Sequence, residues 1–230
     1  MQSVKVLGMA GSPRKNGNTT KMVKRALEGA KSVRGVETEL YELGGKKFHH
    51  CTGCLACAET GECVFKDDLG EFINKYMQAD GVIWGSPIYH MSITGLLKNA
   101  IDRMGNSTFC KWAKQGLDFP RFSKVCGTLT VGFHHYGGQD FVNMFMINSS
   151  LVMNGVVVSG DTLIGNYIGA AGNTVELSME RLKSKEGILE NEEALNSAEN
   201  LGKRVAEMTR IVKAGLLALK DELPKEYLIT

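Results

Sequence analysis

Four cysteines lie close together in one stretch of the chain and could carry metal or redox chemistry. They are Cys51, Cys54, Cys57 and Cys63, in the pattern C-x2-C-x2-C-x5-C. A two-residue spacing lets successive sulfurs turn toward one centre, and four thiolates satisfy a [4Fe–4S] cluster. The pattern differs from the bacterial ferredoxin run C-x2-C-x2-C-x3-C-P. Five residues, not three, separate Cys57 from Cys63, and Val64, not proline, follows Cys63. A four-iron cluster is the favoured interpretation.

Two other interpretations of these cysteines stay open. One is a set of free or oxidisable thiols without a cluster. The other is zinc, which also binds four thiolates, although its usual paired knuckles are separated by a longer span. His49 and His50 could act as ligands, but with four cysteines present we expect them to be loop residues. Cys110 and Cys126 are isolated in the sequence, and Cys126 falls in a predicted strand of the core.

A second candidate site is the polar, glycine-rich stretch GSPRKNGNTT at residues 11–20. It lies between a predicted strand and a predicted helix, and the free N–H groups and dipole of a helix start suit a phosphate. Its hydroxyl and amide donors are Ser12, Asn18, Thr19 and Thr20. Asn18 stands where a Walker A loop has lysine, and Gly8 and Gly11 leave the dinucleotide fingerprint incomplete. The loop predicts a cradle for a mononucleotide ester; the alternative is a polar turn with Thr19 as helix cap.

A third candidate is GSPIYH at residues 85–90, where a predicted strand ends. Ligand loops lie at this end of the strands in doubly wound folds. Pro87 fixes the chain direction, and Tyr89 can lie against a planar ring. The alternative is a simple connection with Tyr89 in the core, and we expect His90 to be a packed polar residue.

A fourth candidate is the loop HHYGGQ at residues 134–139. Gly137 and Gly138 let backbone amides come close to a ligand. His134 and His135 could indicate a metal, but neighbouring side chains usually diverge, so we expect a solvated loop.

Alternating strands and helices must position these loops. The predicted strands are 4–10, 36–41, 81–85, 125–132 and 156–159, and the predicted helices are 20–31, 68–77, 94–103, 141–154 and 194–220. Ser92 is the expected cap of the third helix. Alternation along the whole chain predicts an α/β fold with a five-stranded, doubly wound parallel sheet in the flavodoxin-like order 2-1-3-4-5.

The chain is expected to form one domain with two long additions. Residues 1–160 form the predicted core, which carries the cysteine loop at 44–66. Residues 161–230 form a C-terminal loop and helix that pack on the core and on an oligomer interface. The stretch 161–193 is too long for an ordinary connection, so we expect an oligomer contact or, as the alternative, a lid over the ligand. Basic side chains in the predicted 106–124 connection could meet an acidic partner or form a solvated face: Lys111, Lys114, Arg121 and Lys124.

Composition narrows the class of protein. The chain has 230 residues, with 27 Lys and Arg against 25 Asp and Glu, and this balance argues against nucleic acid as a partner. No apolar run approaches the roughly 18 residues of a membrane span, and no export signal is visible. Six cysteines without such a signal predict a reducing, cytoplasmic location.

The motifs together resemble a known family. GSPRKNGNT after the first strand, GSPIY after the third and LLKNAIDR in the next helix resemble the NADPH-dependent FMN reductase family over about residues 4–160. The four cysteines, followed by Asp67 and Asp68, resemble its iron–sulfur flavoprotein branch. The resemblance implies an FMN phosphate at Ser12, Arg14, Asn18, Thr19 and Thr20. It places the isoalloxazine against Pro87, Ile88, Tyr89 and His90, with Gly137 and Gly138 near the pyrimidine edge.

The resemblance also implies a function. It implies a homodimer or homotetramer with flavin sites near the subunit interfaces, and an enzyme that moves electrons between FMN and a [4Fe–4S] cluster. The donor would be NAD(P)H or ferredoxin, and the acceptor oxygen, peroxide, a quinone or another protein. Because the cofactors carry such chemistry, no catalytic side chain is expected. Two alternatives are a cluster-free NAD(P)H-dependent FMN, quinone or nitro-compound reductase, and a non-enzymatic flavin- or metal-binding regulator.

Overall fold

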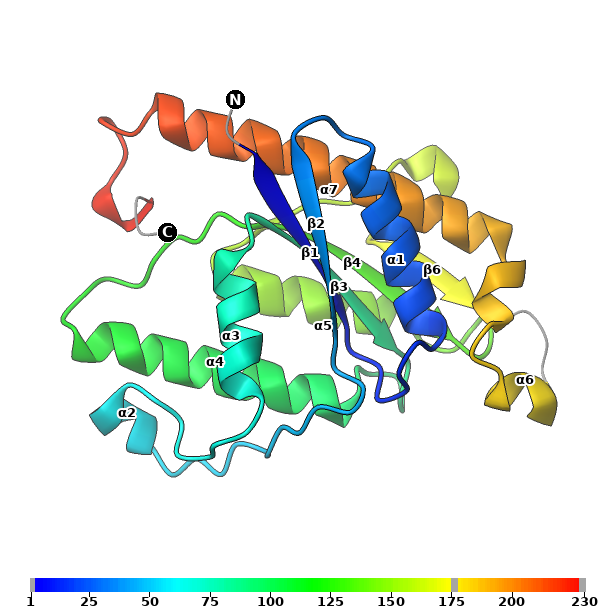
Figure 1. Cartoon of the computed structure of the whole chain (residues 1–230), viewed down its shortest axis with the longest axis horizontal. Coiled ribbons are helices and arrows are strands. Elements are labelled where there is room, and N and C mark those ends of the chain that lie inside the picture. Colours follow the sequence, from blue (N-terminus) through cyan, green and yellow to red (C-terminus); the bar gives the residue numbers. More distant parts are fainter. Residues whose placement is uncertain (1–2, 175–177, 228–230) are drawn as a thin grey trace.

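A parallel sheet lies between two layers of helices (Figure 1). The computed structural model describes residues 3–174 and 178–227. Its strands are β1 (Val4–Ala10), β2 (Val36–Glu42), β3 (Gly81–Pro87), β4 (Val125–Gly132), β5 (Val156–Val157) and β6 (Ala170–Asn173). The order β2-β1-β3-β4-β5, with β6 also paired to β4, confirms the predicted flavodoxin-like topology.

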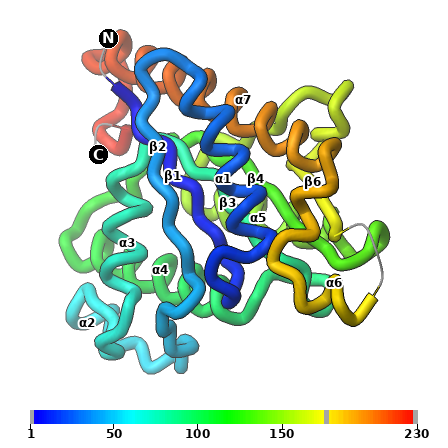
Figure 2. Tube along the Cα trace, turned by 45° about the vertical axis from the view of Figure 1, so that its right-hand side comes forward, coloured from blue at the N-terminus to red at the C-terminus, as the bar shows by residue number. Residues whose placement is uncertain are grey.

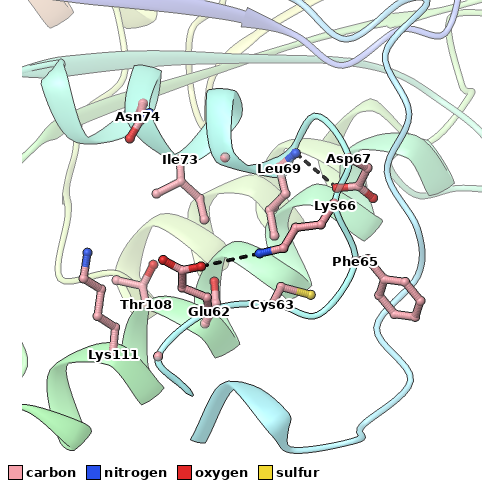
Figure 3. A pocket seen from close by; sticks show the side chains of 13 residues that line it. Glu62, Cys63, Phe65, Lys66, Asp67, Leu69, Ile73, Asn74, Thr108 and Lys111 are labelled. Atoms are coloured by element: carbon pink, nitrogen blue, oxygen red, sulfur yellow. Dashed lines mark hydrogen bonds and ion pairs between the residues drawn. The ribbon is translucent and has the colours of Figure 1, made fainter. Parts of the chain in front are cut away.

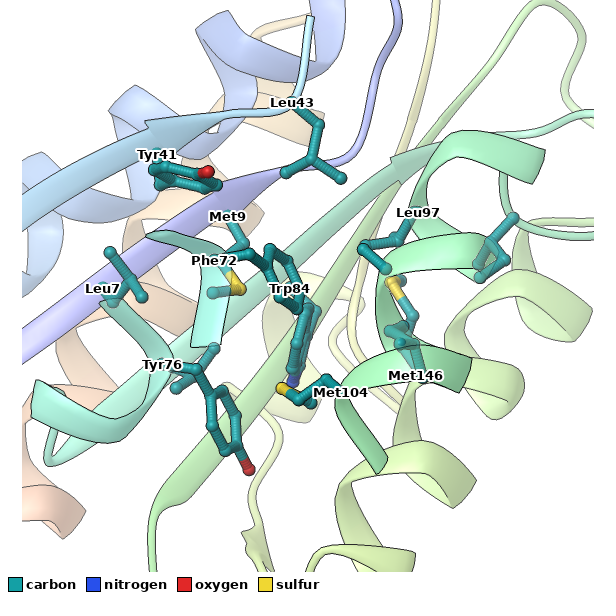
Figure 4. Close-up of a cluster of buried hydrophobic side chains, with 14 of the residues drawn as sticks. Leu7, Met9, Tyr41, Leu43, Phe72, Tyr76, Trp84, Leu97, Met104 and Met146 are labelled. Atoms are coloured by element: carbon teal, nitrogen blue, oxygen red, sulfur yellow. The ribbon is translucent and has the colours of Figure 1, made fainter. Parts of the chain in front are cut away.

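The three central strands are buried on both faces because helices cover both sides of the sheet. Every residue of β4 is buried, and only Lys5 of β1 and Pro87 of β3 are not. On one face pack the helices α3 (Leu69–Gln78), α4 (Gly95–Lys114) and α5 (Gln139–Val152). Figure 4 shows the core beneath them, where Trp84 of β3 lies among Phe72, Tyr76 and Met104.

The other face of the sheet is covered by α1 (Asn18–Lys31) and α7 (Glu192–Ala218). These two helices approach closely because glycines stand at their crossing. A Cβ on Gly202 would lie 1.7 Å from the carbonyl oxygen of Ala26, and one on Gly29 would lie 2.0 Å from that of Glu199. Glycine makes up 27 of the 230 residues, and Gly29 and Gly202 among them serve helix packing.

The last strand position is filled by two pieces, so the sheet has six strands and not the predicted five. β5 pairs with Val125 and Cys126, and β6 pairs with Leu129 to Gly132 further along the same edge of β4. The predicted strand 156–159 is thus only two residues long. β6 was missed because its sequence, AAGN, contains no β-branched or aromatic residue, and only its pairing with β4 makes it a strand.

The helix after β3 differs most from expectation. It begins at Gly95, and the side chain of Thr94 before it accepts the N–H of Leu97, so Thr94 and not Ser92 is the cap. It runs to Lys114 and not to Arg103, so residues 106–114 of the predicted 106–124 connection are helical and the connection is shorter than expected. Two short helices, α2 (Ala56–Thr60) and α6 (Met179–Lys183), lie in the two long loops. No helix in the described ranges is long and apolar enough to cross a membrane.

Candidate functional site

The glycine-rich loop, residues 11–17, joins the carboxyl end of β1 to α1. The N–H of Gly11 donates to the carbonyl of Gly85 on β3 at 2.7 Å, and the Thr94 hydroxyl donates to the carbonyl of Gly11 at 2.6 Å. A Cβ on Gly11 would lie 2.6 Å from the Leu97 Cδ2 methyl and 3.0 Å from the carbonyl oxygen of Gly85, so glycine allows this close approach. The loop is therefore fixed between two strands and the start of α4.

The loop and the first turn of α1 carry free donors. No side chain caps α1, and within residues 3–174 and 178–227 no acceptor takes the N–H groups of Asn18, Thr19 and Thr20. The buried Ser12 oxygen accepts the N–H of Arg14 at 3.1 Å, which leaves its own proton free to donate. These groups can bind an anion with one side chain and a row of backbone amides.

Three of the predicted phosphate side chains have other partners. The Thr20 hydroxyl donates to Glu42 at 2.6 Å. The Arg14 guanidinium donates to the carbonyls of Leu182, Lys183 and Ser184. The Asn18 amide donates to Ser184 at 3.2 Å and accepts the N–H of Ile188 at 3.2 Å. Arg14 and Asn18 thus hold residues 182–188 against the start of α1, and Figure 2 shows this stretch beside α1.

The loop after β3 turns back on itself. Tyr89 and Ser92 exchange backbone hydrogen bonds of 2.9 and 3.0 Å, and the two residues between them, His90 and Met91, have φ of 47° and 61°. This tight turn leaves Tyr89 about half exposed, and not in the core. The aromatic ring is therefore available on the surface at the carboxyl end of the sheet.

The loop after β4 meets the turn after β3. Gly138 has φ of 97°, and a Cβ there would lie 2.7 Å from the sulfur of Met91. A cavity of about 390 Å³ lies between this loop, Met91 and the end of β6. His134, His135 and Tyr136 are exposed, and the ring of His135 contacts Asn173 at 3.0 Å. The strand ends therefore bring the predicted 85–90 and 134–139 loops together.

The cysteine loop folds against α4. Cys51 and Cys54 are exposed, and Cys57 and Cys63 are half-buried. All four thiols line one cavity of about 140 Å³, together with Cys110 of α4. Within the described part of the chain, no three Cys, His, Asp or Glu side chains stand close enough to hold a metal ion as they are placed. The donor set and the shared cavity fit a four-thiolate cluster, and the thiols must converge on it for it to form.

The wall of this cavity was not predicted. Arg103, Asn106, Ser107 and Cys110 recur at helical spacing on α4 and face the thiols. Cys110 lies 3.6 Å from Cys57, sulfur to sulfur, so it is not isolated as expected. The i, i+3, i+4, i+7 pattern was visible in the sequence, but it extends past the point at which the helix was predicted to end.

The thiols differ in their electrostatic surroundings. Hydrogen bonds from the backbone N–H of Ala56 and from the Thr52 side chain lower the pKa of Cys54. Burial and the neighbouring Cys110 raise the pKa of Cys57. The exposed thiol of Cys54 is therefore more readily ionised than that of Cys57.

A larger cavity of about 560 Å³ adjoins the thiol cavity (Figure 3). It lies between the cysteine loop, α3 and α4, and it shares Cys63, Phe65 and Ser107 with the thiol cavity. At its edge Lys66 and Glu62 form an exposed ion pair of 3.5 Å. The fourth cysteine is thus reached from two sides.

Of the basic side chains predicted in the 106–124 connection, not all lie on the surface. Lys124 is buried, and its amine donates to the carbonyls of Met77 and Ala79 at the end of α3. Burial lowers its pKa to about 8. Arg121 donates to the hydroxyl of Tyr227 at 3.1 Å. Lys124 therefore belongs to the packing of α3 and not to a docking face.

Comparisons with known proteins agree on the family that this chain is similar to. The family model of the NADPH-dependent FMN reductases matches residues 4–168. An iron-sulfur flavoprotein of Methanocaldococcus jannaschii is 34% identical over 91% of this chain and 100% of its own length. An iron-sulfur flavoprotein of Methanosarcina thermophila is 33% identical over 75% of this chain and 85% of its own. An FMN-dependent NADPH-azoreductase of Staphylococcus aureus is 30% identical, but over only 50% of this chain and 58% of its own.

Solved structures agree on the fold. A flavone reductase superposes with a TM-score of 0.62 at 23% identity, covering 91% of this chain and 64% of its own. A WrbA-like flavodoxin from Agrobacterium tumefaciens gives 0.56 at 18% identity, covering 92% and 99%. At these identities the likeness concerns the fold alone.

Proposed function

Because the chain belongs to the NADPH-dependent FMN reductase family and is a flavin-dependent oxidoreductase, we propose that its FMN works together with a [4Fe–4S] cluster. The observation that carries the proposal is that the four spaced cysteines line a single cavity. The names of relatives that match most of the chain support it. Bound together, FMN and a cluster supply two-electron and one-electron chemistry in one protein.

The phosphate end of FMN is assigned to the glycine-rich loop. Its ligands would be the hydroxyls of Ser12 and Thr19 and the N–H groups of Asn18, Thr19 and Thr20, which have no acceptor in the described residues. Arg14 would act indirectly and not as a phosphate ligand, because its guanidinium holds residues 182–188 beside the loop. Thr20 would contribute its backbone, since its hydroxyl is bonded to Glu42.

The ring end of FMN is assigned to the two loops that meet at the strand ends. Pro87, Ile88, Tyr89 and His90 would lie against the isoalloxazine. Gly137 and Gly138 would bring backbone amides to its pyrimidine edge, because Gly138 has a conformation that favours glycine. These loops would orient the ring and limit the access of water to one face.

The remaining proposals concern partners. Large apolar side chains are exposed around the ring loops, including Tyr89, Tyr136 and Phe141. Their exposure supports a homodimer or homotetramer in which a second copy covers the flavin. NAD(P)H and ferredoxin stay as the proposed electron donors, and the cytoplasm as the proposed location.

A second candidate function is a cluster-free NAD(P)H-dependent reductase of flavins, quinones or nitro compounds. One observation favours it: within the described ranges the thiols do not yet gather into a metal site. The azoreductase that matches half of the chain points the same way.

Ferredoxin and Cys54→Ser separate the two functions. Reduced ferredoxin, a one-electron donor, should bleach the flavin of the anaerobically purified wild type and should fail with Cys54→Ser. Dithionite should bleach the flavin of both. Cys126→Ala is the matched control, because Cys126 is buried in β4 away from the loop. If ferredoxin bleaches Cys54→Ser at the wild-type rate, the cluster has no part in the electron path and the second function holds.

A further inference from the structure

One arginine is buried at the base of the cysteine loop. Arg103 of α4 is 1% exposed, and its Nε donates to the sulfur of Cys63 at 3.2 Å. Its Nη1 donates to Asp67 at 2.6 Å and to the carbonyl of His49 at 3.1 Å, and its Nη2 donates to the carbonyl of Phe65 at 3.1 Å. A buried charge is costly unless it is paired, and here every guanidinium nitrogen has a partner.

These contacts join the two ends of the loop. His49 precedes the first cysteine of the cluster motif, whereas Phe65 and Asp67 follow the last. Asp67 strengthens the junction, because it also accepts the N–H of His49 at 2.8 Å and that of Leu69 at 3.2 Å. The Arg103–Asp67 pair therefore closes the loop at its base, with Cys63 held on the guanidinium.

A second donor lies one turn further along α4. The Asn106 amide approaches the sulfur of Cys51 at 3.5 Å, so α4 directs N–H groups at the first and the last cysteine of the motif. Hydrogen bonds to cysteine sulfurs and the net charge nearby set the potential of an iron–sulfur cluster. The reason is electrostatic: a reduced cluster carries one more negative charge, which N–H donors stabilise.

We propose that Arg103 is a positioning residue that raises the reduction potential of the cluster through its hydrogen bond to Cys63, while Asp67 balances its charge. This rests on the proposed function, because it requires a cluster on the four cysteines. Asn106 acts in the same direction but more weakly, since it is neutral, exposed and further from its sulfur.

Variants that neutralise Arg103 and Asp67 singly and together separate the effect of charge from that of the hydrogen bond. In Arg103→Gln the hydrogen bond to Cys63 weakens and the carboxylate of Asp67 loses its counter-charge, so the potential should fall. In Asp67→Asn the guanidinium keeps its sulfur but loses its counter-charge, so the potential should rise. In the double variant the net charge equals that of the wild type, and the shift that persists reports the hydrogen bond alone. An arginine with a purely structural role would not give shifts of opposite sign.

The test is an anaerobic redox titration of the cluster, read by EPR, with iron and sulfide measured for each variant. We expect Arg103→Gln to lower the one-electron equilibrium constant about tenfold, which is 59 mV. Asp67→Asn should raise it, and the double variant should lie below wild type. Lys98→Gln is the control, because Lys98 and Asp102 form an exposed ion pair on the same helix. The FMN potentials should be unchanged in all four.

Shifts of one sign, or none, in Arg103→Gln and Asp67→Asn would overturn the inference while leaving the cluster itself established. If Arg103→Gln does not retain iron, Arg103→Lys and Asp67→Asn decide: no rise in Asp67→Asn overturns the inference. Wild-type protein without iron and sulfide would overturn the proposed function, and this inference with it.

Discussion

Two loops of this molecule are built in opposite ways. The glycine-rich loop at residues 11–17 is held by strand ends and by the start of α4, and it offers mainly backbone N–H groups. The cysteine loop at residues 44–66 offers side chains, and it is closed at its base by the Arg103–Asp67 pair. The first is fixed through backbone groups, by the carbonyl of Gly85 on β3 and by Thr94 at the start of α4. The second is fixed through side chains, by Arg103 in the body of the same helix, 40 residues after Cys63.

This difference has a consequence for substitution. A site of backbone donors loses little when one surface side chain changes, because the helix start and the sheet keep the amides in place. A site of thiols held by one buried ion pair is more sensitive. A single substitution removes either one thiol or one partner of the ion pair that holds the loop. The two loops should therefore fail separately.

The largest effect is expected from a thiol. Cys57→Ala should lose nearly all iron and sulfide, because a ligand is removed, and it should keep its FMN. Cys110→Ala, which changes the sulfur 3.6 Å away, should keep both. Metal analysis and the visible spectrum decide the matter. Equal iron loss in the two variants would mean that Cys110 is itself a ligand.

A smaller effect is expected at the other loop. Ser12→Ala removes a buried hydroxyl whose proton is free to donate to a phosphate. FMN binding should weaken about tenfold, because a hydrogen bond to a charged group is worth about 1.5–3 kcal/mol. Riboflavin binding, measured by fluorescence quenching, should not change, and the iron content should stay that of the wild type. Equal loss for FMN and riboflavin would place the phosphate elsewhere.

Arg14→Gln sharpens the contrast further. Arg14 donates to three carbonyls at residues 182–184, so its loss should speed amide hydrogen exchange over 178–190. FMN binding should weaken only a few-fold, because the guanidinium acts through that segment. Lys15→Gln, an exposed neighbour, is the control. A loss of FMN affinity larger than that of Ser12→Ala would make Arg14 a direct ligand.

The smallest effect is expected at acid pH, where protonation of Asp67 should destabilise the base of the cysteine loop but not the glycine-rich loop. Burial alone would raise the pKa of Asp67, but hydrogen bonds from Arg103 and from the amides of His49 and Leu69 lower it below the usual 3.8. The folded state then binds this proton more weakly than the unfolded chain. The stabilisation is complete at neutral pH and is lost as the pH falls through the folded-state pKa, below about 3.8.

Hydrogen exchange of the cluster-free protein should show this loss. The amides of His49 and Leu69 should lose protection below that pH, while the amide of Gly11, bonded to a carbonyl, should not. Asp67→Asn should abolish the difference. If all three amides open together, the unfolding is global and the local account is wrong.

The sequence predicted those features that follow from local pattern. Buried apolar runs located β1, β3 and β4, and the turn residues after them located the three candidate ligand loops. Spacing alone singled out the four cysteines. What could not be predicted depends on contacts between distant segments. β6 is a strand only because β4 pairs with it, and the hydrogen bonds from Arg14 to the carbonyls of residues 182–184 join segments about 170 residues apart.

The wall of the thiol cavity is the clearest case. In the sequence, Arg103 stands out only as part of the LLKNAIDR motif. The residues next to it in the chain do not indicate that it bonds to Asp67 and Cys63. Lys124 was treated as a surface charge because a buried lysine that donates to backbone carbonyls cannot be distinguished by sequence from a solvated one. In both cases burial and pairing set the role of a charged residue, and both are properties of the fold.

One measurement tests the central claim most directly: FMN, iron and acid-labile sulfide counted together in the same anaerobically purified wild-type chain. The account predicts about one FMN, four irons and four sulfides per chain. Yellow protein with less than about one iron per chain, even after reconstitution with iron and sulfide, would contradict the four-thiolate cluster. Colourless protein that takes up no FMN on titration would contradict the assignment of the glycine-rich loop as well.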